Sequence, residues 1–354
     1  MKSCTAILTA LYRANGQFVA ASEVQELLGG SNSVLEAEIA ALHGLGYVIE
    51  LHPHRGYRLL ESPDRLMADD LEARLESFEV RHDAAVVAGR TRVIGSEIMV
   101  FEETASTNDV CEQLARSGGR DGLVVFAESQ TRGRGRRGRA WASPRGKGLW
   151  FSVLLRPQLS TPAAQRFTVA ASVAVARAVR ETSGLDARIK WPNDVTVQGK
   201  KLAGILTELC GGLGSSQAAA SSDGAGGPAP SSITMVLGIG INVNCQQNEF
   251  PPEVAAIATS LSLATGKVQN RPAVAAATLR ALDQWYRAAL TEFDAVTDEW
   301  ARLSTTLGKQ IVVTMGKRRI EGYAQALDGD GALLVRKDNG QVERMLGGDL
   351  VREL

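Results

Sequence analysis

The stretch Gln130–Arg139 reads QTRGRGRRGR and is the most informative ten-residue segment of this 354-residue chain. It holds five arginines and three glycines. Glycine lets the backbone bend tightly, and guanidinium groups on a bent loop can converge on one anion. Apolar runs typical of strands lie on both sides, at Leu123–Phe126 and Leu149–Leu155. The sequence therefore predicts an anion-binding loop between two strands, with phosphate as the expected guest.

A segment that binds nucleic acid without sequence preference has a similar composition and is the main alternative. Such segments usually lie in disordered termini, whereas this one is flanked by apolar strands. Seven cations and no acid lie between Arg132 and Lys147. Because like charges repel each other, we expect this loop to be a lid that becomes ordered when an anion binds.

Around this loop, β-rich runs alternate with helical stretches over residues 98–304, which predicts one α/β domain. Within it, residues 211–232 are mostly Gly, Ser, Ala and Pro, so we expect a flexible insertion in a hairpin. Residues 305–354 alternate with period 2 around turns such as Asn339-Gly340, which predicts a small β-barrel.

The first 63 residues read as three helices and two short strands, the outline of a winged helix-turn-helix domain. Residues 64–97 are expected to be a linker, with a charged connecting helix over Leu66–Val80 that is not part of a core. The predicted fold class is thus α+β, with three domains.

Composition excludes several classes of protein. Lys and Arg together number 39 and so do Asp and Glu, so any site for nucleic acid must be a local patch. The four cysteines never fall in a CxxC spacing, which argues against a disulfide framework or a zinc site and predicts a cytoplasmic protein with no metal ligands of its own. No apolar run approaches the ~20 residues of a membrane span, so no membrane partner is expected.

A second candidate segment is Lys190-Trp191-Pro192-Asn193-Asp194, which is followed after a short strand by Lys200–Leu206. The two flanks of one hairpin bring Asp194 and Lys201 close together. A lysine suits phosphate or carboxylate oxygens, and an aspartate can hold Mg²⁺ or accept a proton. Either residue alone is more often an ordinary surface charge.

Two further segments offer polar or close-packing groups. Ser106-Thr107-Asn108-Asp109 opens a helix, where Ser106 and Asp109 fit a capping box and the helix start also offers hydroxyl and N–H groups to a ligand. Gly238–Asn244 reads GIGINVN, whose small residues let a strand approach a flat ligand. This glycine pair does not fit the dinucleotide fingerprint GxGxxG.

In their order and spacing, these motifs resemble those of biotin protein ligases. With the winged helix in front and the barrel behind, the chain resembles the bifunctional class that joins the ligase to a biotin-operon repressor. The resemblance implies a class II-synthetase-like catalytic domain and an SH3-like C-terminal barrel. It also implies that biotin and ATP form biotinyl-5′-AMP, with Mg²⁺, and that biotin then passes to a lysine of a biotin carboxyl carrier protein.

The resemblance also implies roles for particular residues. Lys201 and Arg136 supply positive charge for catalysis, and Asp194 orients or deprotonates the acceptor lysine. Trp141 is expected either to cover adenine or simply to pack. The residues that the resemblance assigns to biotin or nucleotide binding are Ser106, Thr107, Asn108, Gln130, Arg134, Gly135, Arg136, Trp141, Lys201, Gly204, Gly240 and Asn242.

The N-terminal domain departs from a DNA-binding pattern. No Lys or Arg lies between Ser31 and Glu50, and residues 1–60 hold four basic against five acidic residues, a net charge of −1. Counterion release cannot drive binding with this balance. The acidic third helix therefore argues against the biotin operator as a partner, unless His52, His54, Arg55 and Arg58 on the wing make the contacts.

Three alternatives to the ligase reading remain open from the sequence. The chain could be a DNA-binding or protein-binding biotin sensor without ligase activity, and pyrophosphate release separates these readings. It could instead attach lipoate or another acyl group.

Relatives of the bifunctional class form homodimers, so a homodimer is a further expectation, which the insertion at 211–232 could alter.

Overall fold

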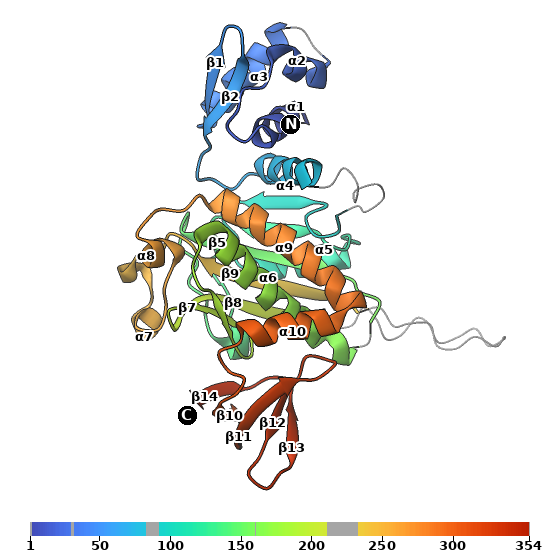
Figure 1. The fold of residues 1–354 in the computed structure, drawn as a ribbon, viewed down its shortest axis with the longest axis vertical. Helices are drawn as coiled ribbons and strands as arrows, with labels where there is room; N and C mark the ends of the chain where they lie inside the picture. The colour runs from blue at the N-terminus through green and yellow to red at the C-terminus, as the bar shows by residue number, and fades with distance from the viewer. Residues whose placement is uncertain (1, 30–31, 83–91, 160, 211–232, 354) are drawn as a thin grey trace, which may run out of the picture. The chain divides into compact units, whose positions relative to one another are not determined.

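The computed structural model describes residues 2–29, 32–82, 92–159, 161–210 and 233–353, so the expected insertion at 211–232 lies outside the described residues. The chain forms two compact units (Figure 1). The N-terminal unit comprises Met1–Arg92 and Asn270–Ala276, and the main unit comprises Val93–Gln269 and Ala277–Leu354. Each unit is described by itself below.

The N-terminal unit begins with three helices and a hairpin, in the order that the sequence predicts. The elements are α1 (Lys2–Arg13), α2 (Ala21–Leu28), α3 (Asn32–Gly44), β1 (Val48–His52), β2 (Gly56–Glu61) and α4 (Ala68–His82). The two strands pair antiparallel. Apolar residues at helical spacing, including Ile7, Leu11, Leu35 and Leu42, meet in one core.

Helix α4 corrects our expectation of a linker over 64–97. Leu71 and Leu75 are fully buried, and α4 packs along α1. The carboxylate of Asp70 is buried but accepts hydrogen bonds from the hydroxyls of Tyr12, at 2.5 Å, and Tyr47, at 2.8 Å. Charged residues surround the apolar positions of this helix, so its sequence resembles a connector although the helix closes the core.

The main unit is built on a seven-stranded sheet. Its strands, from edge to edge, are β3 (Ile98–Phe101), β4 (Val124–Ala127), β5 (Gly148–Leu155), β9 (Met235–Asn242), β8 (Lys200–Leu209), β7 (Asp194–Val197) and β6 (Arg188–Lys190). Strands β3 and β4 run parallel, and every other pair of neighbours is antiparallel. All residues of β5 are buried, because helices cover both faces.

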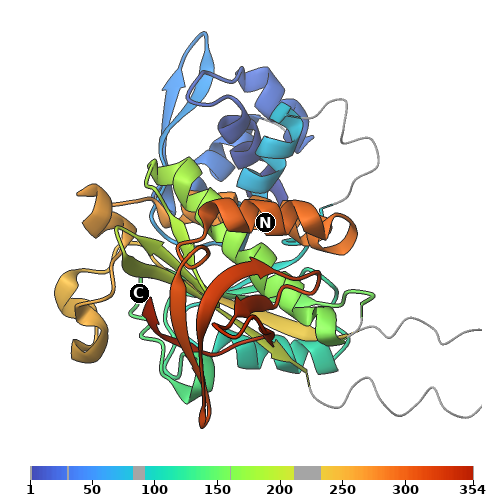
Figure 2. The ribbon, with the colours of Figure 1, turned by 60° about the horizontal axis from the view of Figure 1, so that its bottom comes forward.

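The register of the sheet fixes which helix covers which face. Ser152 of β5 contacts Thr107 of α5 (Thr107–Arg116), with 2.7 Å between the hydroxyl oxygens. Through β9, Ser152 is aligned with Leu206 of β8, so the next residue, Thr207, points to the opposite face. There it contacts Thr168 of α6 (Gln165–Ser183), also at 2.7 Å. Figure 2 shows these helices on opposite sides of the sheet.

Further helices and a second sheet complete the main unit. The helices are α7 (Pro252–Ala255), α8 (Leu261–Thr265), α9 (Arg271–Thr291), which starts in the N-terminal unit, and α10 (Phe293–Leu303). The C-terminal sheet has the order β13 (Val342–Met345), β12 (Leu333–Arg336), β11 (Arg318–Leu327), β10 (Gln310–Met315) and β14 (Asp349–Glu353). In the part of the chain that the structure describes, no helix has the length and apolar character needed to span a bilayer.

Candidate functional site

The residues singled out from the sequence gather on the sheet face that α5 covers. They come from the start of α5, from the arginine loop (residues 132–139) and from the β7–β8 hairpin. Gly240 is paired with Trp150 and with Gly204, so these positions share the face of Ser152. The motifs are far apart in the sequence, and the sheet register brings them together.

Five polar side chains form a hydrogen-bonded row on this face, which we call the polar chain: Gln130, Thr107, Ser152, Asn108 and Glu208. The backbone N–H and the hydroxyl of Thr107 lie 2.9 and 3.2 Å from Gln130 Oε1. Ser152 donates to Asn108 Oδ1 at 2.5 Å, and Asn108 Nδ2 donates to Glu208 Oε2 at 2.6 Å. Ser152 and Glu208 were not predicted. A serine within the apolar run Leu149–Leu155 was the available signal.

The arginine loop folds back on itself tightly. Gly135 N–H donates to the carbonyl of Arg139 at 2.7 Å, and Arg136–Gly138 form a single 3₁₀ turn. Arg137, at φ 57°, occupies the left-handed region that a non-glycine residue rarely adopts. A Cβ atom on Gly133 would lie 2.4 Å from the carbonyl oxygen of Trp141, so glycine is required there.

Carboxylates from other segments neutralise most cations of this region. Arg134 pairs with Asp109 and, at 3.0 Å, with Glu208, whereas Arg137 pairs with Asp349 of the C-terminal sheet. Arg139, Arg145 and Lys147 pair with Asp349, Glu102 and Glu249. The expected repulsion within the loop is therefore offset without a ligand, because the acids come from outside the segment.

Arg136 differs from its neighbours. Its Nη1 donates to the neutral Asn193 Oδ1 at 2.9 Å, and no carboxylate of the described residues forms an ion pair with it. Burial and, next, the nearby charge of Arg137 lower its pKa from the ordinary value. The loop thus contains one partly buried guanidinium whose charge has no partner acid in contact.

The β7–β8 hairpin confirms the expected proximity of Asp194 and Lys201, whose Oδ1 and Nζ atoms lie 2.7 Å apart. Lys201 Nζ also lies 5.3 Å from the centre of the Trp141 ring. Asn193, which holds Arg136, directly precedes Asp194. Arg136 and Lys201 therefore contact the same short segment, residues 193–194, rather than separate cavities.

Trp141 lies over the two glycines that were expected to admit a flat ligand. A Cβ atom on Gly240 or Gly204 would stand 2.5 or 2.9 Å from the indole ring. The indole Nε1 is buried and makes no hydrogen bond with the described residues. In this structure the flat group on the glycines is thus the protein's own tryptophan.

The start of α5 differs from the expected capping box. Ser106 is the N-cap residue, but its hydroxyl makes no capping hydrogen bond, and Asp109 pairs with Arg134 instead. The side chain of Gln130 caps Thr107 N–H. The hydroxyl of Ser106, a buried residue, makes no hydrogen bond with any described residue and remains available to a ligand.

Asn242 has a structural contact. Its Nδ2 donates to the carbonyl of Thr259 at 3.0 Å, and Thr259 N–H donates to the carbonyl of Lys201. It therefore holds the segment beside Lys201.

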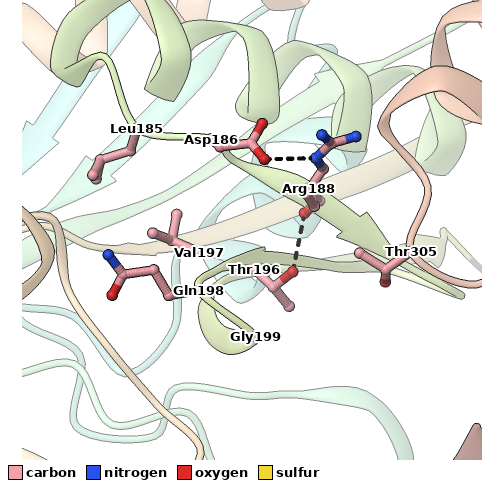
Figure 3. A pocket seen from close by; sticks show the side chains of 8 residues that line it. All are labelled: Leu185, Asp186, Arg188, Thr196, Val197, Gln198, Gly199 and Thr305. Carbon is pink, nitrogen blue, oxygen red and sulfur yellow. Dashed lines mark hydrogen bonds and ion pairs between the residues drawn. The ribbon is translucent and has the colours of Figure 1, made fainter.

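A cavity of about 290 Å³ lies elsewhere, beside the start of β6, the end of β7 and the Gln198-Gly199 turn (Figure 3). Asp186 and Arg188 in its lining pair with each other at 2.9 Å. None of the residues predicted for the site lines it. We place the functional site on the α5 face, where the unpaired polar groups are.

The described residues hold no group of three or more His, Cys, Asp or Glu side chains that could enclose a metal ion. A divalent cation at this site would need ligands from a bound substrate, as Mg²⁺ commonly has when it binds phosphates.

Comparison with known proteins places this geometry in a family. Residues 100–220 match the model of the Biotin/lipoate A/B protein ligase family, and residues 306–351 match that of the Biotin protein ligase C terminal domain. The chain is 30% identical to the Bifunctional ligase/repressor BirA of Bacillus subtilis over 339 residues, which is 96% of this chain and 95% of that protein.

Two further relatives support the same family assignment. The Bifunctional ligase/repressor BirA of Escherichia coli is 28% identical over 343 residues, covering 95% of this chain and 94% of that one. Biotin protein ligase from Aquifex aeolicus, solved in complex with biotin and ATP, is 27% identical with a TM-score of 0.59 and covers 73% of this chain and 100% of that chain. The chain belongs to the biotin protein ligase family.

Proposed function

We propose that this chain is an ATP-dependent biotin–[biotin carboxyl carrier protein] ligase, which forms biotinyl-5′-AMP and transfers biotin to a carrier lysine. The observation that carries the proposal is the convergence of Arg136, which lacks a carboxylate partner, and Lys201 on residues 193–194. The polar chain and the unpaired hydroxyl of Ser106 lie on the same sheet face. The family membership supports both half-reactions.

The first half-reaction joins two anions, because a carboxylate attacks the α-phosphate of ATP. Preorganised cations stabilise the charge that develops there. Arg136 supplies a guanidinium that needs no prior release from an acid. Lys201 must exchange Asp194 for a phosphate oxygen, which its mobile point charge allows. Mg²⁺ enters this proposal bound to the nucleotide, since the described residues offer no enclosing ligand set.

The second half-reaction needs a neutral lysine amine on the carrier protein. When Lys201 turns to phosphate, Asp194 loses its partner and can accept a proton or orient the incoming amine. This exchange couples the two steps, because the same ion pair supplies the cation first and the base afterwards.

The test is incubation with ATP, Mg²⁺, labelled biotin and a biotin carrier domain. We expect pyrophosphate release and a labelled carrier, with lipoate in place of biotin giving neither. Lys201→Ala should slow adenylate formation by about 10²-fold, whereas Lys200→Ala, its exposed neighbour, is the matched control. Biotin binding without pyrophosphate release would leave a sensor instead of an enzyme.

A second candidate function is repression of transcription, which the printed names of the bacterial relatives support. In that proposal the N-terminal unit is a winged helix that binds an operator. The structure gives it few free cations. Arg58 pairs with Glu50 at 2.5 Å, and both Arg55 and Arg58 lie over the ring of Phe18. The helix α3 exposes Val34 and no basic side chain except His43.

The proposal has three further parts: a biotin carboxyl carrier protein is the acceptor, the C-terminal sheet is an SH3-like barrel, and the chain forms a homodimer. Asp349 of the C-terminal sheet pairs with Arg137 of the arginine loop, which supports the assignment of this sheet to the catalytic unit. Sedimentation analysis with and without biotin and ATP tests the dimer.

A further inference from the structure

We infer that Glu208 is a positioning residue that sets the direction of the hydrogen bonds from Asn108 through Ser152 to Thr107 and thereby determines which ring groups of the vitamin the site accepts. The inference rests on the proposed function and names a residue whose side chain lies beyond the expected ligand contacts.

The argument begins at the charged end of the polar chain. An ionised carboxylate can only accept hydrogen bonds. Glu208 Oε2 lies 2.6 Å from Asn108 Nδ2 and 3.0 Å from Arg134 Nη2, so both nitrogens donate to it. Because the amide nitrogen faces Glu208, the amide oxygen of Asn108 faces the other way.

The orientation of Asn108 then fixes the donor and acceptor roles of the two hydroxyls. Asn108 Oδ1 accepts from Ser152 Oγ at 2.5 Å, which commits the single hydrogen of that hydroxyl. Thr107 Oγ1 lies 2.7 Å from Ser152 Oγ, and either could donate if the pair were isolated. Since Ser152 has given its hydrogen to Asn108, it cannot donate to Thr107, and the single hydrogen of Thr107 goes to Ser152 Oγ or to Gln130 Oε1 at 3.2 Å. Thr107 then offers only lone pairs to a ligand.

The far end of the polar chain is also fixed. Gln130 Oε1 accepts from Thr107 N–H at 2.9 Å, so its Nε2 donates to Ser143 Oγ at 2.9 Å. Ser152, Thr107 and Asn108 are all buried, at 0%, 3% and 6% exposure, so water does not interrupt the hydrogen bonds between these three residues. A Cβ atom on Gly238 would lie 2.3 Å from Asn108 Oδ1, so the glycine makes room for this amide.

The ligand consequence follows from the chemistry of a cyclic urea, which has N–H donors and a carbonyl acceptor. A threonine that offers lone pairs binds a ring N–H and rejects an acceptor at the same place. Without the charge on Glu208, an amide at that position can turn its nitrogen to Asn108 when Arg134 keeps only its pair with Asp109, and the hydrogen bonds from Asn108 to Thr107 can reverse. Thr107 would then accept from Ser152 and keep its own hydrogen for Gln130 or for a ligand acceptor, so the site would lose its preference.

The central variant is Glu208→Gln, which keeps the shape and removes the obligatory acceptor. We expect the KM for biotin to rise about tenfold, the effect of one hydrogen bond, while the KM for ATP and the adenylation kcat change less than threefold. Ser152→Ala cuts the row between Glu208 and Thr107. In that background, adding Glu208→Gln should leave the KM for biotin unchanged.

The control is Asp109→Asn, which removes the other carboxylate of Arg134 but has no place in the polar chain. Any effect that it has on biotin should persist in the Ser152→Ala background. If Glu208→Gln raises the KM by the same factor with and without Ser152, the effect travels through Arg134 and the inference is wrong. Calorimetric binding of biotin gives the same comparison where turnover is too slow. An inactive wild-type chain would contradict the proposed function, whereas an active one with an unaffected Glu208→Gln variant contradicts only this inference.

Discussion

The arginine loop has the composition of an anion-binding element and the N-terminal unit has the outline of a DNA-binding domain, yet the two regions use their charges differently. In the loop, acids from distant segments hold Arg134, Arg137 and Arg139, and Arg136 keeps its charge without a partner acid. In the N-terminal unit, the buried charge of Asp70 joins helices, and the basic residues of the hairpin stack on Phe18. Among the described residues of the first region, one cation thus stays without a partner acid, whereas charge contributes to packing in the second.

The largest effect that this comparison predicts is the loss of Arg136. Arg136→Ala should slow adenylate formation by about 10²–10³-fold, because it removes a preorganised cation from the transition state. Arg139→Ala is the matched control, since that side chain is 72% exposed and lies 3.5 Å from Asp349. Pyrophosphate release from both variants measures the contrast. Equal losses would mean that the loop acts only through its total charge.

The second prediction concerns the buried carboxylate of the N-terminal unit. Asp70→Ala should destabilise that unit by about 3 kcal/mol, because it leaves Arg74 and two tyrosine hydroxyls without their shared acceptor. Tyr47→Phe, which removes one of those hydrogen bonds, should cost about 1 kcal/mol. Hydrogen exchange of the α1 and α4 amides reports on both. Unchanged protection in Asp70→Ala would show that the charge is not structural.

The third prediction concerns basic side chains introduced on α3, which has no Lys or Arg. Glu36→Lys with Ala40→Lys should steepen the slope of log K against log salt for duplex DNA by about 1.8, since each phosphate contact contributes about 0.9. Fluorescence anisotropy between ~50 and ~200 mM KCl measures the slope. A wild-type chain with biotin and ATP that already binds an operator tightly and salt-dependently would overturn the contrast.

The smallest effect concerns the buried thiols of the main unit. Burial raises the pKa of Cys111 and of Cys245 from 9.0 to about 12, so both stay protonated near pH 8. They should react slowly with iodoacetamide in the folded protein and rapidly once it unfolds. Because the folded pKa is the higher one, their contribution to stability is complete below pH 9 and is lost as the pH rises towards 12. Fast inactivation at pH 8 would show that a thiol takes part in the site.

The motifs could be found in the sequence because each is a short contiguous segment whose residue types indicate its chemistry. The Gln198-Gly199 turn joins β7 to β8 in one hairpin, and this alone predicts that Asp194 and Lys201 meet. The glycines and arginines of the loop likewise indicate a bend that carries cations. The sequence predicted the helix α4 but not its place in the core, because charged residues surround its apolar positions and its core partner, α1, lies at the other end of the unit's sequence.

The sequence by itself determined the family, the order of the motifs and the residue types that approach an anion. Only the tertiary structure decided which partly buried arginine of the loop has no carboxylate partner in the described part of the chain and which side chains form the polar chain. Asp109 lies 25 residues from Arg134, Glu208 lies 74 residues from it, and Asp349 lies 212 residues from Arg137. Ion pairs and hydrogen bonds act over a few ångströms of space. The number of residues between two partners therefore does not predict such a contact, because the sheet register sets the distance between their side chains.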